Sequence, residues 1–174
     1  MITRLFNKIL TITGRKIIQF SPERSGSTLV FNILQDLFPT RYVKKQHNYH
    51  LDDKIFPTVI TYRHPYDCIA SLILKDQVSL TDQIIEDKIM LFRKSGWNDF
   101  LNQFESPKIL FLRYENFYND IDFILNSIEG YFKIHISENK RVKLRNKYKI
   151  SSVKKQIAKF KSFSEFDTRS HFHG

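Results

Sequence analysis

The sequence has a single cysteine, Cys68, so no disulfide can form within the chain. Such sparse cysteine is typical of proteins in a reducing compartment, and we therefore expect a cytoplasmic protein. No apolar run approaches the roughly 20 residues that a membrane-spanning helix needs, so we expect no membrane span. Residues 1–14 mix charged and apolar side chains and lack the apolar block of a secretory signal.

Glycine and proline are also scarce, with five of each among 174 residues, and no low-complexity linker or internal repeat divides the chain. Apolar residues make up 41% of the sequence and aromatic residues 14%, which is enough to bury a core. We therefore expect one domain over residues 1–174.

Acidic residues are absent from segment 140–161, which carries ten basic ones: Lys140, Arg141, Lys143, Arg145, Lys147, Lys149, Lys154, Lys155, Lys159 and Lys161. The other 18 basic residues balance the 18 acidic ones, so the net charge of +10 belongs to this basic segment. It either attracts an anionic partner or forms a solvated helix face. Its only aromatic residues are Tyr148 and Phe160, which disfavours nucleic-acid binding by base stacking.

Predicted strands and helices alternate along the chain. Short apolar and β-branched runs predict strands at 16–20, 42–47, 58–62 and 108–113. Apolar residues at helical spacing predict helices at 28–38, 65–74, 80–104 and 119–132. The third is either one helix or a broken pair, with Thr81 as N-cap. The alternation predicts an α/β fold of three layers, with helices on both faces of a central parallel sheet.

Ligands of such sheets bind beyond the carboxyl ends of the strands, where polar residues of this chain are expected to converge. They are the loop 21–28 and the side chains of His47, Arg63 and Tyr114. The loop joins a strand to a helix, so its N–H groups can cradle a phosphate. Gly26 permits close approach of the ligand. An ordinary turn that caps a helix is the alternative interpretation.

The loop is not a Walker A motif, because Ser21 and Ser27 stand where that motif needs its first glycine and its lysine. Its basic residue, Arg24, comes before the glycine instead. Downstream, Arg63 ends a predicted strand and Ser71 lies two helical turns later. The planar guanidinium of Arg63 suits a phosphate, although both residues could equally lie on the surface without a ligand.

In combination these motifs resemble the PAPS-dependent sulfotransferase family, whose fold is P-loop NTPase-like; PAPS is 3′-phosphoadenosine 5′-phosphosulfate. The family pattern has a basic residue followed by Ser-Gly-[Ser/Thr]-Thr, then Arg-x-Pro-x-Asp-x-x-x-Ser and Tyr-Glu. Here the three motifs are found at 24–28, 63–71 and 114–115, in family order and each after a predicted strand. The resemblance covers residues 16–132.

The resemblance implies transfer of a sulfo group from PAPS to a hydroxyl or amine, with PAP as product and no metal. The loop Ser25, Gly26, Ser27 and Thr28 would bind the 5′-phosphate end. Arg24 would stabilise charge on the oxygen between sulfur and phosphorus. Arg63 and Ser71 would hold the 3′-phosphate, and Tyr114 would contact the adenine region.

A Lys-x-His segment supplies the general base in cytosolic members of the family, and Lys45 and His47 occupy the matching positions. A histidine pKa suits this task. His50 and a carboxylate are the alternative bases. The acceptor, whether small molecule, glycan or peptide, is not identified by the sequence, nor is the oligomeric state.

Two features depart from the family. The glycine-rich C-terminal segment with a tryptophan is missing, and residues 169–174 resemble its start, which suggests a truncated chain. Leu29 stands where many members place an aromatic residue against adenine. An inactive PAP-binding relative is therefore one alternative, and a P-loop kinase-like phosphotransferase is another.

Overall fold

The structure is a computed structural model that describes residues 15–47, 55–76, 79–94 and 108–157. The chain divides into two compact units, Met1–Glu115 and Asn116–Gly174, and each is described by itself. The expectation of a single domain stays a prediction.

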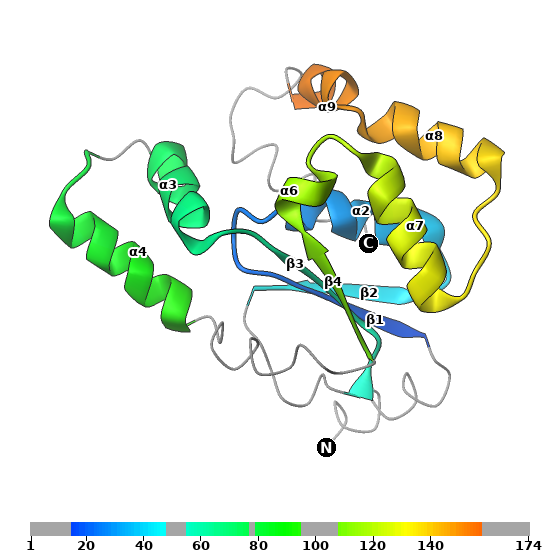
Figure 1. Cartoon of the computed structure of the whole chain (residues 1–174), viewed down its shortest axis with the longest axis horizontal. Coiled ribbons are helices and arrows are strands. Elements are labelled where there is room, and N and C mark those ends of the chain that lie inside the picture. Colours follow the sequence, from blue (N-terminus) through cyan, green and yellow to red (C-terminus); the bar gives the residue numbers. More distant parts are fainter. Residues whose placement is uncertain (1–14, 48–54, 77–78, 95–107, 158–174) are drawn as a thin grey trace. The chain divides into compact units, whose positions relative to one another are not determined.

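The first unit contains a four-stranded sheet in the order β2-β1-β3-β4 (Figure 1). Its strands are β1 (Lys16–Phe20), β2 (Tyr42–Gln46), β3 (Thr58–Tyr62) and β4 (Ile109–Arg113). All pairings are parallel, and Phe20 at the end of β1 lies opposite Gln46 on one side and Ile60 on the other. The α/β class with a central parallel sheet is therefore confirmed.

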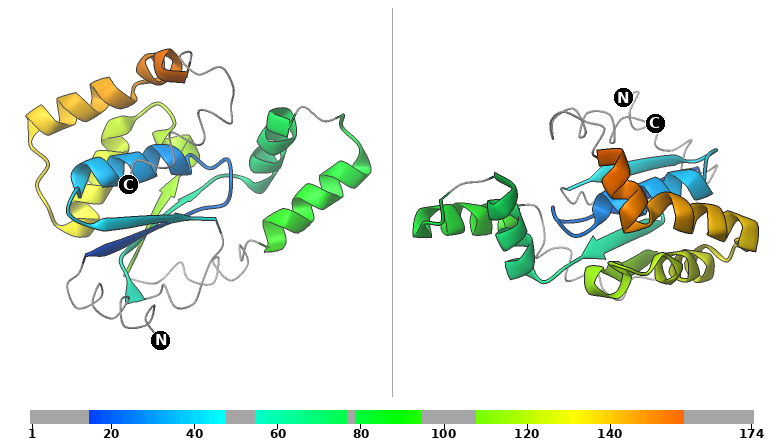
Figure 2. Two further views of the ribbon diagram at one scale, coloured as in Figure 1. Left: turned by 180° about the vertical axis from the view of Figure 1, so that it is seen from behind. Right: turned by 90° about the horizontal axis from the view of Figure 1, so that it is seen from above.

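The described residues of the first unit contain three helices of more than two turns. Helix α2 (Ser27–Leu37) connects β1 to β2 and contacts both strands (Figure 2), whereas α3 (Pro65–Asp76) and α4 (Asp82–Lys94) lie between β3 and β4 in the chain. The two crossovers run outward in opposite directions from the middle of the sheet. Cys68 of α3 and Phe92 of α4 pack into a cluster with Phe20 of β1.

The element boundaries follow the local sequence signals closely. The predicted strands at 16–20 and 58–62 match β1 and β3 residue for residue. The N-cap prediction for Thr81 is also confirmed, because its Oγ1 accepts a hydrogen bond from the N–H of Ile84 at 3.3 Å. Of the predicted helix 80–104, residues 82–94 form α4, and 95–107 lie outside the described residues.

Four further helices follow β4 in the described residues: α6 (Tyr114–Phe117), α7 (Ile121–Phe132), α8 (Glu138–Tyr148) and α9 (Ile150–Ile157). Only α7 was expected from apolar spacing; its N-cap Asp120 accepts a hydrogen bond from the N–H of Phe123. None of the helices in the described ranges combines the length and apolarity needed to cross a membrane.

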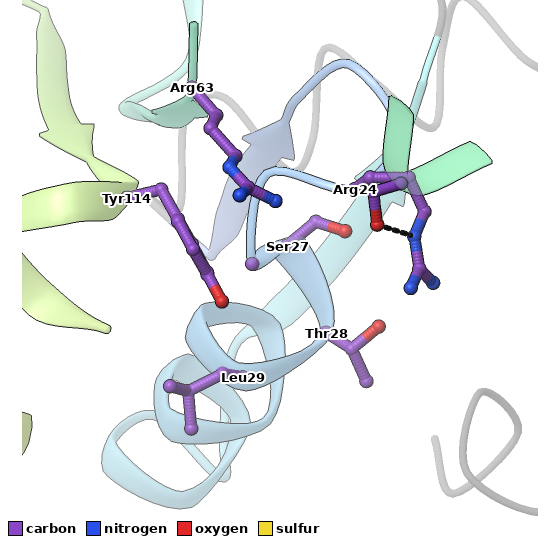
Figure 3. A pocket seen from close by; sticks show the side chains of 8 residues that line it. Arg24, Ser27, Thr28, Leu29, Arg63 and Tyr114 are labelled. Atoms are coloured by element: carbon purple, nitrogen blue, oxygen red, sulfur yellow. Dashed lines mark hydrogen bonds between the residues drawn. The ribbon is translucent and has the colours of Figure 1, made fainter. Parts of the chain in front are cut away.

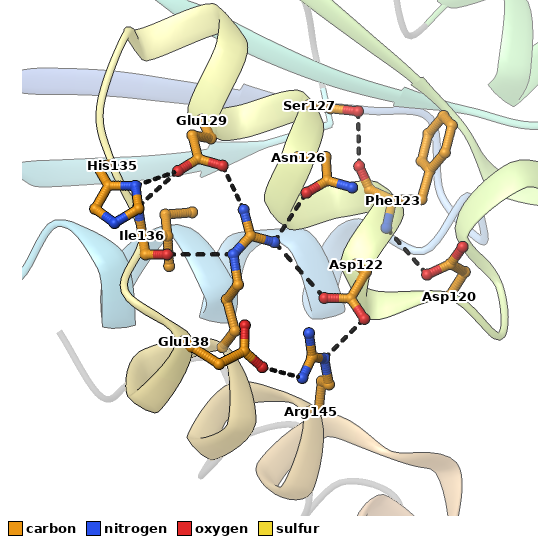
Figure 4. Close-up of polar contacts among 11 residues, drawn as sticks. Asp120, Asp122, Phe123, Asn126, Ser127, Glu129, His135, Ile136, Glu138 and Arg145 are labelled. Carbon is orange, nitrogen blue, oxygen red and sulfur yellow. Dashed lines mark hydrogen bonds and ion pairs between the residues drawn. The ribbon is translucent and has the colours of Figure 1, made fainter.

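Two arginines of the basic segment connect α8 to α7 (Figure 4). Arg141 forms ion pairs with Glu129 and Asp122, while Arg145 pairs with Asp122 at 2.7 Å and with Glu138 at 2.7 Å. The hydrogen bonds to Asp122 and Glu138 raise the pKa of Arg145. Part of the basic excess is thus internal to the second unit.

Candidate functional site

A pocket of about 230 Å³ lies beside the loop that joins β1 to α2 (Figure 3). The strand order places β2 outward from β1 and β4 outward from β3, so the direction of connection changes between β1 and β3. Such a switch point is where open α/β sheets bind ligands. The pocket is lined by Arg24, Gly26, Ser27, Thr28, Leu29, Arg63, Ser71 and Tyr114. It gathers seven of the eight residues that the sequence predicted to bind the nucleotide.

The loop has an unusual backbone at two positions. Arg24 has φ 65° and Gly26 has φ 80°, both in the left-handed region. Glycine adopts this region freely, whereas an arginine there persists only when its surroundings hold it. Turns with left-handed residues can direct successive N–H groups toward one point and form a concavity that binds anions. The loop thus has the backbone character of an anion site.

The N-terminus of α2 adds to this character. Gly26 is its N-cap and provides no side-chain cap, and the first turn contains no acidic residue. The first N–H groups of an α-helix have no partner within the helix, and the helix dipole favours a negative charge beside them. The helix end at Ser27 and Thr28 is therefore suited to bind a phosphate or a sulfo group.

Arg24 and Ser71 connect this loop to α3. The Nε of Arg24 donates a hydrogen bond to Oγ of Ser71 at 3.0 Å, across 47 positions of sequence. Figure 3 shows Arg24 and Arg63 on either side of Ser27. Two guanidinium groups therefore flank the pocket.

Arg63 lies against Tyr114 across the pocket. Its guanidinium carbon is 4.7 Å from the centre of the Tyr114 ring, and its Nε is 3.9 Å from a carboxylate oxygen of Asp67. Stacking on the ring and the nearby carboxylate restrict the direction of the guanidinium. These two contacts give Arg63, which follows β3, a preferred direction, while no described residue accepts a hydrogen bond from its buried Nε.

Ser25 is the one predicted ligand residue that does not line the pocket. It is fully buried, and its hydroxyl donates to the carbonyl oxygen of Pro22 at 2.7 Å. The side chain therefore faces the protein interior, and only the backbone N–H of Ser25 could serve a ligand. Spacing in the sequence shows that a serine is in the loop but not which way its side chain points.

Lys45 and His47 lie at the carboxyl end of β2 and do not line the pocket, but both contact its surroundings. Nζ of Lys45 donates to Oγ1 of Thr28 at 2.9 Å, and Nδ1 of His47 lies 2.9 Å from the carbonyl oxygen of Ser21. Since a carbonyl only accepts, Nδ1 carries the proton, and a neutral His47 has its lone pair on Nε2. The competing base His50 lies outside the described residues.

Cys68 lies in the first turn of α3, five residues after Arg63. Burial raises the pKa of its thiol to about 12, against the opposing charge of Arg63. The thiol therefore stays protonated at neutral pH and is a poor nucleophile, so it is not a candidate for covalent chemistry beside the pocket.

No family model matches this chain, and no curated protein matches its sequence. Among solved structures the chain is similar to mouse sulfotransferase SULT7A1 complexed with PAP, with a TM-score of 0.63 and 15% sequence identity. The match covers 81% of this chain and 66% of that structure, so the chain spans about two thirds of the neighbour's length. This similarity shows a sulfotransferase-like fold, as the sequence motifs predicted.

Proposed function

We propose that this protein is a PAPS-dependent sulfotransferase that moves the sulfo group of PAPS to a hydroxyl or amine. The observation that carries the proposal is the pocket itself: Arg24, Arg63 and the N-terminus of α2 surround one space at the switch point of the sheet. These groups are cationic or partly positive, and PAPS carries its negative charge on the 3′-phosphate and the 5′-phosphosulfate of its ribose.

In the proposed reaction the lone pair of the acceptor oxygen or nitrogen attacks sulfur while the bond from sulfur to the bridging oxygen breaks. The electron pair of that bond stays with PAP, and the acceptor's proton passes to the base. Arg24 stabilises the charge that develops on the bridging oxygen, and the N–H groups of residues 25–28 bind the 5′-phosphate. Because these groups offset the negative charge of PAPS, we propose a reaction without a metal.

Arg63 and Ser71 are the proposed ligands of the 3′-phosphate, and Tyr114 is the proposed contact of the adenine. All three side chains line the same pocket as the loop, which supports one binding site for the whole nucleotide. Leu29 also lines it, where many sulfotransferases have an aromatic residue. We therefore propose a weaker hold on adenine, and an inactive PAP-binding relative is the second candidate.

His47 is the proposed general base. Its Nδ1 contact with the Ser21 carbonyl sets the tautomer in which Nε2 can accept a proton. His50 or a carboxylate is the alternative. Lys45, through its bond to Thr28, is the proposed cation beside the sulfo group. We propose a cytoplasmic reaction and a small-molecule, glycan or peptide acceptor.

The test compares ligands and then measures transfer. PAP should raise the melting temperature far more than ATP with Mg²⁺, and labelled PAPS should transfer its sulfo group to members of a panel of hydroxylated acceptors. Binding of PAP without transfer to any acceptor would support the inactive relative. Stabilisation by ATP with Mg²⁺ but not by PAP would support a kinase-like phosphotransferase and overturn the proposal.

A further inference from the structure

A series of hydrogen-bonded, buried polar side chains lies beneath the loop that borders the pocket. Gln19 of β1, Thr61 of β3 and Ser25 of the loop have no exposed surface. Gln19 pairs with Val59, and because side chains alternate along a strand, Gln19 and Thr61 point to the same face of the sheet. Buried hydroxyl and amide groups are costly unless they bond one another, so their arrangement needs an explanation.

The hydrogen bonds of this series donate in one direction, from the sheet toward the loop. The Ser25 hydroxyl donates to the carbonyl of Pro22 at 2.7 Å, and it also lies 3.2 Å from the carbonyl oxygen of Thr61. With that proton engaged, the contact of 3.1 Å between Oγ of Ser25 and Oγ1 of Thr61 is donated by Thr61. Oγ1 of Thr61 in turn accepts from Nε2 of Gln19 at 3.4 Å.

We propose that Thr61 is a positioning residue that holds the loop in its anion-binding conformation. Ser25 stands between Arg24 and Gly26, the two left-handed positions of the loop. A left-handed arginine is unfavourable by itself, and neighbouring residues must hold it. The Thr61 hydroxyl holds Ser25 from beneath the loop, so the hydrogen bond of a strand residue 36 positions away keeps the loop N–H groups in place. This inference rests on the proposed function for its ligand, PAP.

The same strand offers a matched control. Thr58 is also buried, at 5% exposure, and its Oγ1 donates to the carbonyl of Phe56 at 3.0 Å. It begins β3, whereas Thr61 lies next to the strand's last residue, beside the loop. Thr58→Val and Thr61→Val therefore each remove one buried threonine hydroxyl from β3. Only Thr61→Val removes a hydroxyl that contacts Ser25.

The experiment measures PAP affinity by calorimetry and thermal stability for Thr61→Val, Thr61→Ser and Thr58→Val. Thr61→Val should weaken PAP binding on the order of 3- to 10-fold, the effect expected for one hydrogen bond. Thr61→Ser should restore the affinity, because it keeps the hydroxyl. Thr58→Val should lower the melting temperature without changing the affinity. Equal losses of affinity in the two valine variants, or no rescue by serine, would overturn the positioning role.

A second measurement does not depend on any nucleotide. Hydrogen exchange without ligand follows the amides of Ser21 and Val30, which bond to Gln46 and Gly26 on either side of the loop. Thr61→Val should speed their exchange relative to Thr58→Val. If the wild type does not bind PAP, the proposed function fails while this comparison still decides the role of Thr61. Equal exchange in both variants would contradict that role.

Discussion

The Nε of Arg24 donates a hydrogen bond to the Oγ of Ser71, so the loop after β1 and helix α3 are joined in the lining of the pocket. The two residues belong to different sequence motifs and lie 47 positions apart. The bond holds the guanidinium of Arg24 by its inner nitrogen. Among the described residues, none accepts a hydrogen bond from its two terminal nitrogens.

Arg24 is the first site to test, because its charge should matter most as the S–O bond breaks. Arg24→Ala should lower kcat on the order of 100-fold or more, as expected when a donor to a developing anion is lost. Arg24→Lys should retain part of the activity, since a point charge can still reach the bridging oxygen. Sulfo-transfer rates measured with and without EDTA complete the test. An Arg24→Ala variant with full turnover, or a wild type that stops in EDTA, would contradict the mechanism.

Arg63 should distinguish PAP from a nucleotide without the 3′-phosphate. Arg63→Ala should weaken PAP binding roughly 10- to 100-fold, the effect of losing a charged hydrogen bond, and should hardly change binding of adenosine 5′-phosphate. Calorimetry with both ligands provides the measurement. Arg113→Ala is the control, because this exposed arginine ends β4, pairs with Glu115 at 3.0 Å and does not line the pocket. If Arg63→Ala weakened the binding of PAP and of adenosine 5′-phosphate equally, Arg63 would not be the ligand of the 3′-phosphate.

His47 should affect the rate rather than nucleotide binding. His47→Ala should lower kcat on the order of 10²- to 10⁴-fold and leave PAP affinity nearly intact, because a general base acts on the acceptor. Steady-state kinetics and PAP titration separate these effects. His135→Ala in the second unit, an exposed histidine that pairs with Glu129, should leave the rate unchanged. An unchanged rate in His47→Ala would shift the role to His50 or a carboxylate.

Glu129 should make the stability of the fold depend on acid pH. The N–H of Ile136 and the guanidinium of Arg141 hold the pKa of Glu129 below its ordinary value of 4.5. The carboxylate is the form that the fold stabilises, so its contribution is present above pH 4.5 and is lost as the pH falls through the lower value. Glu129→Gln should therefore melt below the wild type at neutral pH, with a smaller difference in acid. Glu86→Gln, on the exposed surface of α4, should melt like the wild type at neutral pH. A constant difference between Glu129→Gln and wild type across the acid range would contradict the assignment.

Residues 16–20 and 58–62 could be assigned as strands because each is a short apolar run with clear ends, and both match the structure. Helix α8 could not be assigned this way. Only Leu144 and Tyr148 are buried in it, so it has little apolar periodicity. Arg141 and Arg145 attach it to α7 through ion pairs with Asp122 and Glu129. These acidic residues lie 12 or more positions earlier in the sequence than the arginines that bind them.

The strand-loop-helix at 16–38, the arginine that follows the strand at 58–62 and their common place at one edge of a parallel sheet could all be predicted from the sequence. These features follow from turn residues, apolar spacing and the geometry of parallel strands, all of which are local or general. Three features could be seen only in the folded chain: Ser25 faces the interior, Arg24 donates a hydrogen bond to Ser71, and Thr61 lies beneath the loop. Those contacts join residues 36 and 47 positions apart, and side-chain direction at such a distance depends on how the chain packs.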